Sequence, residues 1–567
     1  MRPADLCSRS QRPIPLRKTN GNMHHAAMRL RKLMHKLVLR SPQESSAWRE
    51  EGSKRRVSKV HPARVRIHGN KLASRFVEQA MRSIRNRTGL VVLGVLWVCA
   101  CDESVAQDTP SDTVNAVDGQ VSETDASTDA PFVDVTDNAD APYAPDAPSV
   151  DGRRIEQVVT GGGHACAVRH DGTVQCWGVN SKGQLGLGDI EVRGDQLAEM
   201  GAALTPVDIG GLVRAMTLGF DFSCALLLDG NVKCWGNNGY GQLGLGDTTA
   251  RGSVPGQMGS ALGTIDLGVG RTATAISAGK EHACALLDSG QVKCWGNNAN
   301  GRLGLGDVKA RGDAKNEMGD QLPTVQLGKG RSAKAIACGA MHTCALLDNS
   351  QVKCWGDNSG GQLGLGDTEN RGESTAQMGD ALASVLLGVG RTVKSLAAGY
   401  AFNCAILDDD ALKCWGGNVT GELGLESAAW HGMKPSEMGD ALPSVNLGKG
   451  RAASKVTGGL GFACALLDID AVKCWGANGY GQLGLGDTAT RGLAKNTMGD
   501  ALPEVSLGGK VSTVSAGHYH TCAVLSDGRV KCWGFSGVGA LGLGDKERRG
   551  DGPGEMGSAL PAVDLGK

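Results

Sequence analysis

This chain of 567 residues lacks the short motifs that mark many enzyme sites, and it is poor in aromatic residues. No G-x-S-x-G, H-E-x-x-H or G-x-x-x-x-G-K-[ST] motif is present, so the sequence supports neither a hydrolase elbow, nor a zinc protease, nor a phosphate-binding loop. Aromatic residues make up only 4% of the chain, so a core must come mainly from Val, Leu, Ile, Ala and Trp. We predict no catalytic residue, no metal site and no cofactor.

An excess of basic residues is also missing from residues 153–567, which hold 37 Lys and Arg against 41 Asp and Glu. Proteins that bind nucleic acid need positive charge to neutralise phosphates, so we expect no nucleic-acid partner. Two oppositely charged segments precede this region. Residues 1–80 hold 19 basic residues against 5 acidic ones, whereas residues 102–152 hold 13 acidic residues and no Lys or Arg. Self-repulsion and low hydrophobicity predict a disordered acidic linker over 102–152.

An export signal is predicted between these segments, over residues 81–101. Three arginines precede an apolar stretch at 90–98 that is too short to cross a bilayer comfortably. The signal ends in Val-Cys-Ala-Cys, which resembles a bacterial lipobox, and we expect Cys101 to carry a lipid anchor that attaches the protein to the cell envelope. A plain signal peptide, and therefore a secreted protein, is one alternative; a buried apolar strand is the other.

The position of this signal bears on residues 1–80, because a signal peptide begins its chain. Met81 is therefore expected to be the true start, and the basic segment 1–80 is expected not to be translated. In the alternative interpretation, residues 23–40 form a basic amphipathic helix that binds membrane or nucleic acid.

One pattern recurs seven times from residue 153 onward, as in HTCALLDNSQVKCWGDNSGGQLGLGD at 342–367. Each copy has two cysteines ten residues apart, the second followed by Trp-Gly, and successive copies begin 58 or 60 residues apart. This period, with short apolar strands and glycine-rich turns, predicts a β-propeller or a solenoid. The cysteine pairs are Cys166 and Cys176, Cys224 and Cys234, Cys284 and Cys294, Cys344 and Cys354, Cys404 and Cys414, Cys464 and Cys474, and Cys522 and Cys532.

Within each copy, Cys-Ala-Leu-Leu and Gln-Val-Lys-Cys-Trp are typical of two strands joined by a three-residue turn. The last turn residue suits a left-handed backbone: it is Gly290 in one copy and Ser350, Asp410 or Asp470 in others. A hairpin centred on this turn places its two cysteines directly opposite each other, within disulfide reach. Zinc is the alternative for paired cysteines, although metal sites prefer closer spacing. Seven disulfides favour a compartment outside the reducing cytosol.

The predicted fold class is all-β, a seven-bladed β-propeller with four-stranded blades over 153–567. Most copies contain a further expected strand, such as 322–328, ahead of the next hairpin. The first copy has no such strand before it, while the chain ends on an orphan copy at 560–566. We expect the orphan strand to complete the first blade and close the ring, which removes open sheet edges. An open superhelix is the alternative.

These units, AG..HTCAL…G.VKCWG.N..GQLG.GD, resemble the repeats of the regulator of chromosome condensation family over the whole of 153–567. The resemblance implies seven blades and diverse partners, because the family includes a nuclear guanine-nucleotide exchange factor and a secreted inhibitor of β-lactamases. The cysteine pairs and the inserted MG.ALP.V.LG segments depart from the nuclear pattern, which weakens the transfer of exchange activity.

Three repeated features are interpreted as structural. The histidine two residues before a cysteine is replaced by phenylalanine in three copies, which favours packing over metal binding. Six copies carry Asp-x3-Arg, and the fifth loses both charges together, which predicts that the two residues pair. Cys338 has no obvious disulfide partner and is expected to be a small buried residue.

The fifth copy has Trp430 and His431 where the other loops carry the Asp-x3-Arg pattern. An exposed tryptophan is a plausible binding residue, while filling of the space left by the missing pair is the alternative. We predict a monomeric, non-catalytic scaffold that binds a protein or a surface polymer through its blade loops. A secreted inhibitor of an exported hydrolase and an exchange-factor-like regulator are the alternative functions.

Overall fold

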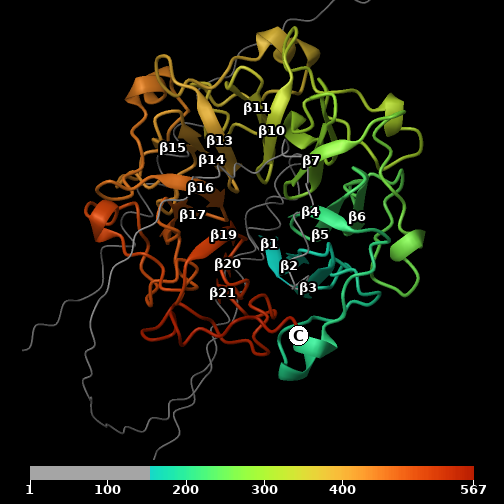
Figure 1. Cartoon of the computed structure of the whole chain (residues 1–567). Coiled ribbons are helices and arrows are strands. Elements are labelled where there is room, and N and C mark those ends of the chain that lie inside the picture. The colour runs from blue at the N-terminus through green and yellow to red at the C-terminus, as the bar shows by residue number, and fades with distance from the viewer. Residues whose placement is uncertain (1–153, 567) are drawn as a thin grey trace, which may run out of the picture. The chain divides into compact units, whose positions relative to one another are not determined.

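The computed structural model describes residues 154–566, which form seven three-stranded antiparallel sheets around a common centre (Figure 1). Residues 1–80, the signal at 81–101 with Cys101, and the linker at 102–152 lie outside the described residues. Within the part described, no helix has the length and apolar character needed to cross a membrane.

Each sheet contains three consecutive strands, which lie side by side in chain order. The strands are β1 (Ile155–Thr160), β2 (His164–Arg169) and β3 (Val174–Gly178); β4 (Val213–Leu218), β5 (Phe222–Leu227) and β6 (Val232–Gly236); β7 (Ala273–Ala278), β8 (His282–Leu287) and β9 (Val292–Gly296); β10 (Ala333–Cys338), β11 (His342–Leu347) and β12 (Val352–Gly356); β13 (Val393–Ala398), β14 (Phe402–Leu407) and β15 (Leu412–Gly416); β16 (Ala453–Gly458), β17 (Phe462–Leu467) and β18 (Val472–Gly476); β19 (Val511–Ala516), β20 (His520–Leu525) and β21 (Val530–Gly534).

Short 3-10 helices lie in the connections that follow the third strands. They are η1 (Leu197–Glu199), η2 (Gly201–Ala203), η3 (Gly259–Ala261), η4 (Ala299–Gly301), η5 (Gly319–Gln321), η6 (Thr375–Gln377), η7 (Gly379–Ala381), η8 (Pro435–Glu437), η9 (Gly439–Ala441) and η10 (Gly499–Ala501).

The core lies between adjacent sheets. The middle and third strands are buried on both faces, so they show no alternation of buried and exposed residues. The cluster between the fourth and fifth sheets, for example, joins Leu346 and Val352 of one sheet to Leu407 and Trp415 of the next. The seven Trp side chains of the repeated Trp-Gly pairs are fully buried in such clusters. Because each sheet shares its core with both neighbours, the seven repeats depend on one another.

The hairpin geometry agrees with the sequence. The two cysteines of every predicted pair lie directly opposite each other on the second and third strands, at disulfide-bonding distance and with Cα atoms 4.0 to 4.1 Å apart. The last turn residue has a positive φ angle, 75° at Gly290, 61° at Ser350, 64° at Asp410 and 61° at Asp470. The prediction of a left-handed turn residue is therefore confirmed.

The expected fourth strand of each blade is not formed. The position beyond the third strand holds one isolated bridge, such as Gly178 with Arg193. The segment at 322–328 is not a strand either, since a single backbone bond, from Val325 N to Val292 O at 2.8 Å, attaches it to β9. Its Leu and Val side chains are buried between sheets, so packing rather than a ladder of hydrogen bonds holds it.

The ring closes as predicted. However, the prediction that the orphan segment completes the first blade is wrong. Val563 N donates to Val530 O at 2.8 Å, so the segment at 560–566 attaches to the seventh sheet as its equivalents attach to theirs. Backbone and side-chain contacts both close the ring: Gly201 N donates to Asp564 O at 2.9 Å, Arg169 of the first sheet donates to Leu565 O at 2.6 Å, and Trp177 packs with Val563 in one cluster. Strand β1 also contacts β19 and β20 directly, which makes the ring a closed propeller.

Candidate functional site

A central channel of about 230 Å³ is enclosed by the first strand of each of the seven sheets. Its lining consists of the ends of these strands and the glycines that follow them, and among the described residues it includes no Asp or Glu. Side-chain oxygens join the strands around the channel: Thr217 Oγ1 accepts from Ala278 N at 3.0 Å, and Ser277 Oγ accepts from Cys338 N at 2.9 Å. The hydroxyl groups of the channel wall therefore serve to connect neighbouring sheets.

Aromatic rings from three separate sheets meet at one end of the channel. Phe220 and His518 have ring centroids 4.6 Å apart, and Tyr400 meets His518 edge to face at 5.9 Å. The ammonium group of Lys280 lies 5.6 Å from the Phe220 centroid. Burial, with a smaller contribution from the charge of Lys280, lowers the pKa of His518 to about 4, so this ring is neutral at physiological pH. The rings of Phe220, Tyr400 and His518 therefore form an uncharged cluster at this end of the channel. We call this end the mouth.

The surface around the mouth is built from four positions in every repeat, and we call it the mouth face. Two of these positions precede the second strand, the third follows the third strand, and the fourth lies three residues further on. A backbone bond holds two of them together, as in Phe535 N to Tyr519 O at 2.9 Å. The residues are Gly162, Gly163, Val179, Lys182, Phe220, Asp221, Asn237, Tyr240, Lys280, Glu281, Asn297, Asn300, Ala340, Met341, Asp357, Gly360, Tyr400, Ala401, Gly417, Thr420, Leu460, Gly461, Ala477, Tyr480, His518, Tyr519, Phe535 and Val538.

The mouth face holds aromatic residues that the core does not use. Of the nine Phe and Tyr residues in 154–566, the three that replace the repeated histidine are buried in the core, namely Phe222, Phe402 and Phe462. The other six all occupy mouth-face positions. Tyr480 lies 5.1 Å from Tyr519 and 5.2 Å from Phe535, and Tyr519 lies 6.3 Å from His518. These contacts connect the cluster of the sixth and seventh repeats to the rings at the mouth.

The opposite face, formed by the turns between second and third strands, has a different character, and we call it the turn face. Ion pairs recur along it, between Arg271 and Asp288 at 3.4 Å and between Arg331 and Asp348 at 3.1 Å. The chain also enters the propeller here, because Arg154 O accepts a bond from His170 N at 2.8 Å in the first turn. The turn face is therefore repetitive and charged, whereas the mouth face differs from repeat to repeat.

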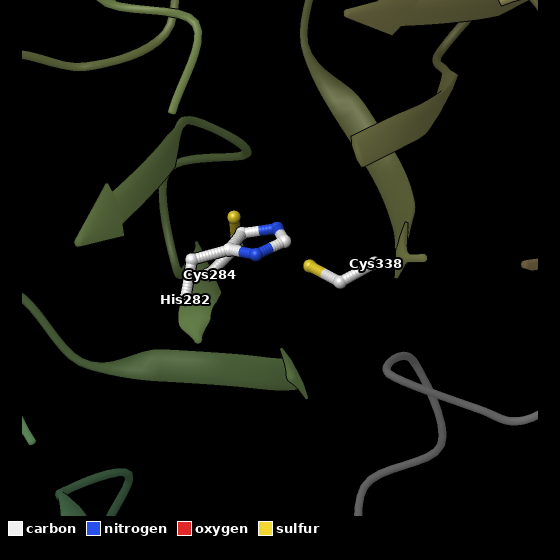
Figure 2. Close-up of side chains that lie close together, drawn as sticks. All are labelled: His282, Cys284 and Cys338. Carbon is white, nitrogen blue, oxygen red and sulfur yellow. The ribbon is translucent and has the colours of Figure 1, made fainter. Parts of the chain in front are cut away.

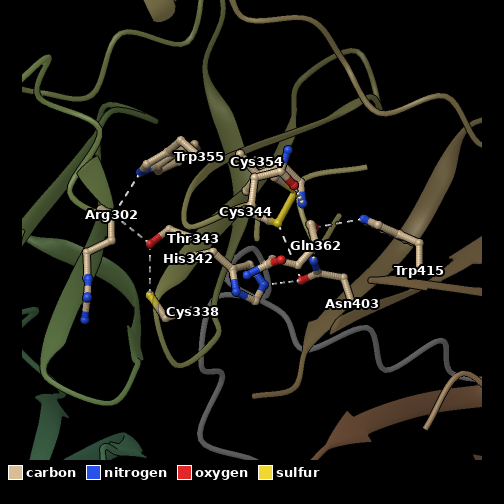
Figure 3. The surroundings of a disulfide bond; sticks show 12 residues. Arg302, Cys338, His342, Thr343, Cys344, Cys354, Trp355, Gln362, Asn403 and Trp415 are labelled. Atoms are coloured by element: carbon tan, nitrogen blue, oxygen red, sulfur yellow. Dashed lines mark hydrogen bonds between the residues drawn. A yellow bond between two sulfur atoms is a disulfide. The ribbon is translucent and has the colours of Figure 1, made fainter. Parts of the chain in front are cut away.

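The repeated histidines are structural. Figure 3 shows His342 beside the Cys344–Cys354 disulfide, with its Nε2 atom 3.0 Å from Asn403 Oδ1 of the next sheet. Burial lowers the pKa of His342 to about 4 and that of His164 to about 3. These imidazoles are neutral and enclosed, in agreement with the interpretation that the position serves packing.

One cluster resembles a metal site in composition only. His282, Cys284 and Cys338 bring possible ligand atoms within 4.8 Å of one another (Figure 2). However, Cys284 is bonded to Cys294, so its sulfur carries no thiolate. Burial raises the pKa of the Cys338 thiol to about 12, and that thiol donates to Ser277 O at 3.5 Å. Cys338 is a buried free cysteine, as the sequence indicated.

The Asp-x3-Arg residues pair in all six repeats that carry them, with oxygen–nitrogen distances of 2.5 to 2.7 Å. In the fifth repeat, His431 keeps the backbone bridge to Gly416, and its Nδ1 atom lies 3.3 Å from Glu437 O. Trp430 is 36% exposed, and its ring lies against Gly360 on the mouth face. It therefore borders the mouth face without joining the aromatic cluster.

Sequence reasoning missed two features. The lysine of the repeated Val-Lys-Cys-Trp is buried: Lys293 Nζ, for example, donates to Leu267 O at 3.0 Å and to Gly319 O at 2.7 Å. Its recurrence in six of seven repeats was the available signal. The aromatic cluster was missed because its members come from different repeats, although the variation between repeats at those positions pointed to them.

Comparison with known proteins agrees with this architecture. A model of the regulator of chromosome condensation (RCC1) repeat matches seven segments, 155–184, 213–242, 273–302, 333–362, 393–422, 453–482 and 511–540, and a second model of the same repeat matches 229–286, 289–346 and 472–524. The chain belongs to the regulator of chromosome condensation repeat family.

Relatives within this family have different roles. The chain is 28% identical to the ultraviolet-B receptor UVR8 of Arabidopsis thaliana over 403 residues, which is 70% of this chain and 80% of the receptor. It is 27% identical to the human E3 ubiquitin-protein ligase HERC2, of which it covers only 7%. The structure of yeast RCC1 (Prp20) bound to Kap60 shares the fold, with a TM-score of 0.51 at 19% identity, covering 76% of this chain and 91% of that one.

Proposed function

We propose that this protein is a non-catalytic propeller that binds a protein partner through its mouth face, outside the reducing cytosol. The observation that carries the proposal is the placement of six Phe and Tyr residues at mouth-face positions in a chain with few aromatic residues. Protein interfaces are enriched in Tyr, Phe and Arg, and their binding energy concentrates in a few such residues. A repeated framework with variable loops suits recognition of one specific surface.

A protein is a better partner than a surface polysaccharide. Sugars bind flat on exposed aromatic faces, but Lys280 lies over the ring of Phe220 and Arg548 over that of Tyr480. The remaining rings of the cluster meet one another at steep angles, such as 67° between Tyr480 and Tyr519. This surface offers edges and small apolar patches, which suit side chains of another protein.

The location outside the cytosol rests on the seven cysteine pairs, because reducing compartments keep such thiols free. We further propose that Cys101 carries a lipid that anchors the protein to the cell envelope. The chain enters the propeller at the turn face, so an anchored protein would keep the mouth face available to a partner. In cells given radiolabelled palmitate, the wild-type protein should be labelled and the Cys101→Ser variant should not. Absence of label from the wild-type protein would contradict the proposed lipid anchor.

Photo-crosslinking tests the binding face. The photoreactive residue p-benzoylphenylalanine replaces Tyr519 on the mouth face, which is 37% exposed, or Ile469 on the turn face, which is 38% exposed. Expressed in the native host, the Tyr519 variant should give one discrete protein adduct, identifiable by mass spectrometry, and the Ile469 variant should not. Adducts of equal yield at both positions, or none at Tyr519, would contradict binding through the mouth face.

A further inference from the structure

The loop after the third strand of the seventh repeat contains an arginine that no other repeat has. Arg548 precedes Arg549, the residue that bridges to Gly534. The equivalent residues of the other repeats are Val192, Ala250, Ala310, Asn370, Trp430 and Thr490. Arg548 and Trp430 thus share one position, and each lies against a mouth-face residue of the preceding repeat, Tyr480 and Gly360 respectively.

The other cations of this loop form close ion pairs within the protein, whereas Arg548 forms only a long one, with Asp551. Arg549 pairs with Asp545 at 2.7 Å, and Lys546 pairs with Asp195 at 3.1 Å. Arg548 Nη1 lies 4.0 Å from Asp551 Oδ2, which is beyond hydrogen-bond distance. Among residues 154–566, no group accepts a hydrogen bond from its guanidinium, and the side chain is 45% exposed.

Stacking holds this guanidinium in place. Its carbon atom lies 4.9 Å from the ring centroid of Tyr480, which in turn meets Tyr519 and Phe535 edge to face. A stacked guanidinium loses less conformational entropy when it binds, and its planar fork matches the two oxygens of a carboxylate. The adjoining rings of Tyr519 and Phe535 offer apolar surface beside that fork.

We infer that Arg548, Tyr480, Tyr519 and Phe535 form the docking point for a protein segment that carries a carboxylate next to an apolar side chain. The carboxylate binds the guanidinium of Arg548 through two hydrogen bonds, and the apolar side chain packs on Tyr519 and Phe535. This inference rests on the proposed function and names the chemistry of the partner at one part of the mouth face. Its composition of Arg and Tyr is that of a binding hot spot.

Short peptides provide a direct probe for the purified full-length protein. The test peptide is dye-labelled Gly-Leu-Asp-Leu-Gly with blocked ends, and the controls replace Asp by Asn or both Leu residues by Ala. Fluorescence anisotropy gives the dissociation constant of each. We expect the test peptide to bind at least about tenfold more tightly than the Asn control, which corresponds to about 1.4 kcal/mol, and more tightly than the Ala control.

The decisive variants are Arg548→Gln and a matched control, Arg529→Gln. Arg529 lies on the turn face, is 50% exposed and pairs with Asp527 at 2.6 Å. Arg548→Gln should weaken binding of the test peptide by about tenfold or more, whereas Arg529→Gln should change it less than about twofold. Circular dichroism confirms that both variants fold. Equal binding of Asp and Asn peptides, unchanged affinity in Arg548→Gln, or no binding by the wild type at millimolar peptide would overturn the inference.

Crosslinking separates this inference from the proposed function. Arg548→Gln is added to the variant that carries the photoreactive residue at position 519. If the yield of the adduct is undiminished, the mouth face binds a protein but Arg548 does not contribute to binding. In that case only the inference is wrong. If the wild-type background gives no adduct from Tyr519, the proposed function falls as well.

Discussion

His342 of the fourth sheet and Asn403 of the fifth form a buried pair, with Nε2 and Oδ1 3.0 Å apart. Asn403 follows Phe402, the fifth repeat's counterpart of His342. The same relation joins His164 to Ser223 at 3.0 Å and His282 to Thr343 at 2.9 Å. Two of the three phenylalanines at the His342 position are Phe222 and Phe402. In the sheets that follow them, the position of Asn403 is occupied by Ala283 and Ala463. In these five repeats, the choice of His or Phe follows the hydrogen-bonding capacity of the next sheet.

A double-mutant cycle tests this pairing. Asn403→Ala leaves the His342 imidazole without a partner for Nε2, and it should lower the free energy of unfolding by about 1 to 3 kcal/mol. Adding His342→Phe recreates the Phe402–Ala463 arrangement and should recover part of that loss. Urea denaturation under non-reducing conditions measures both effects. If the double variant lost the sum of the two single effects, the residues would not be coupled.

His520 and Phe462 are the two exceptions to this relation, and replacement of His520 should stabilise the protein. Its Nε2 atom is buried and has no partner among the described residues, and Ala165 holds the equivalent position in the first sheet. His520→Phe removes the unpartnered nitrogen and should raise the free energy of unfolding by about 1 kcal/mol near neutral pH. A lower urea midpoint for this variant at pH 7.5 would show that the imidazole makes a net favourable contribution.

The same variant gives a pH-dependent signature. Burial lowers the pKa of His520 to about 4, against 6.5 for an exposed histidine, with a smaller contribution from His518. As the pH falls from 6.5 towards 4, the unfolded chain takes up a proton that the folded chain does not, so the wild type loses stability over this range. The advantage of His520→Phe should therefore be larger at pH 5 than at pH 7.5. Urea midpoints at the two pH values check it, and an equal or smaller advantage at pH 5 would contradict the assignment.

The buried lysines should be replaceable by glutamine more readily than by methionine. Lys293 Nζ joins Leu267 O and Gly319 O, whereas the first repeat has Gln175, whose Nε2 donates to Leu204 O at 2.6 Å. Lys293→Met leaves two carbonyl groups without this donor and should cost about 1 to 3 kcal/mol. Lys293→Gln should cost less, because one bond can be kept. Thermal denaturation compares the two, and equal losses would mean that these bonds do not contribute.

The sequence predicted the local parts of this fold better than the long-range ones. The cysteine pairing and the left-handed turn at Ser350 depend on a single hairpin, whose pattern recurs seven times. The expected fourth strand failed because its apolar residues, such as Val325, are buried by packing between sheets without forming a ladder. Apolar alternation alone does not distinguish these two cases.

The mouth face could not be predicted from any one repeat. Phe220, Tyr400 and His518 belong to the second, fifth and seventh repeats and meet only because the ring closes. The sequence pattern indicated Trp430 as the exceptional loop residue, yet its ring lies against Gly360. Arg548, at the same repeat position, lies over the ring of Tyr480. Which loop position faces a neighbouring repeat depends on the closed geometry, and the sequence specifies that geometry only through all seven repeats together.

The measurement that tests this account most directly is the redox state of the paired cysteines in native material. Protein isolated from its host is quenched with acid, denatured and alkylated, and its peptides are mapped by mass spectrometry before and after reduction. The account predicts that the fourteen cysteines of the seven pairs stay unmodified until reductant is added, while Cys338 is alkylated beforehand. Alkylation of the paired cysteines before reduction would contradict a disulfide-bonded propeller that works outside the cytosol.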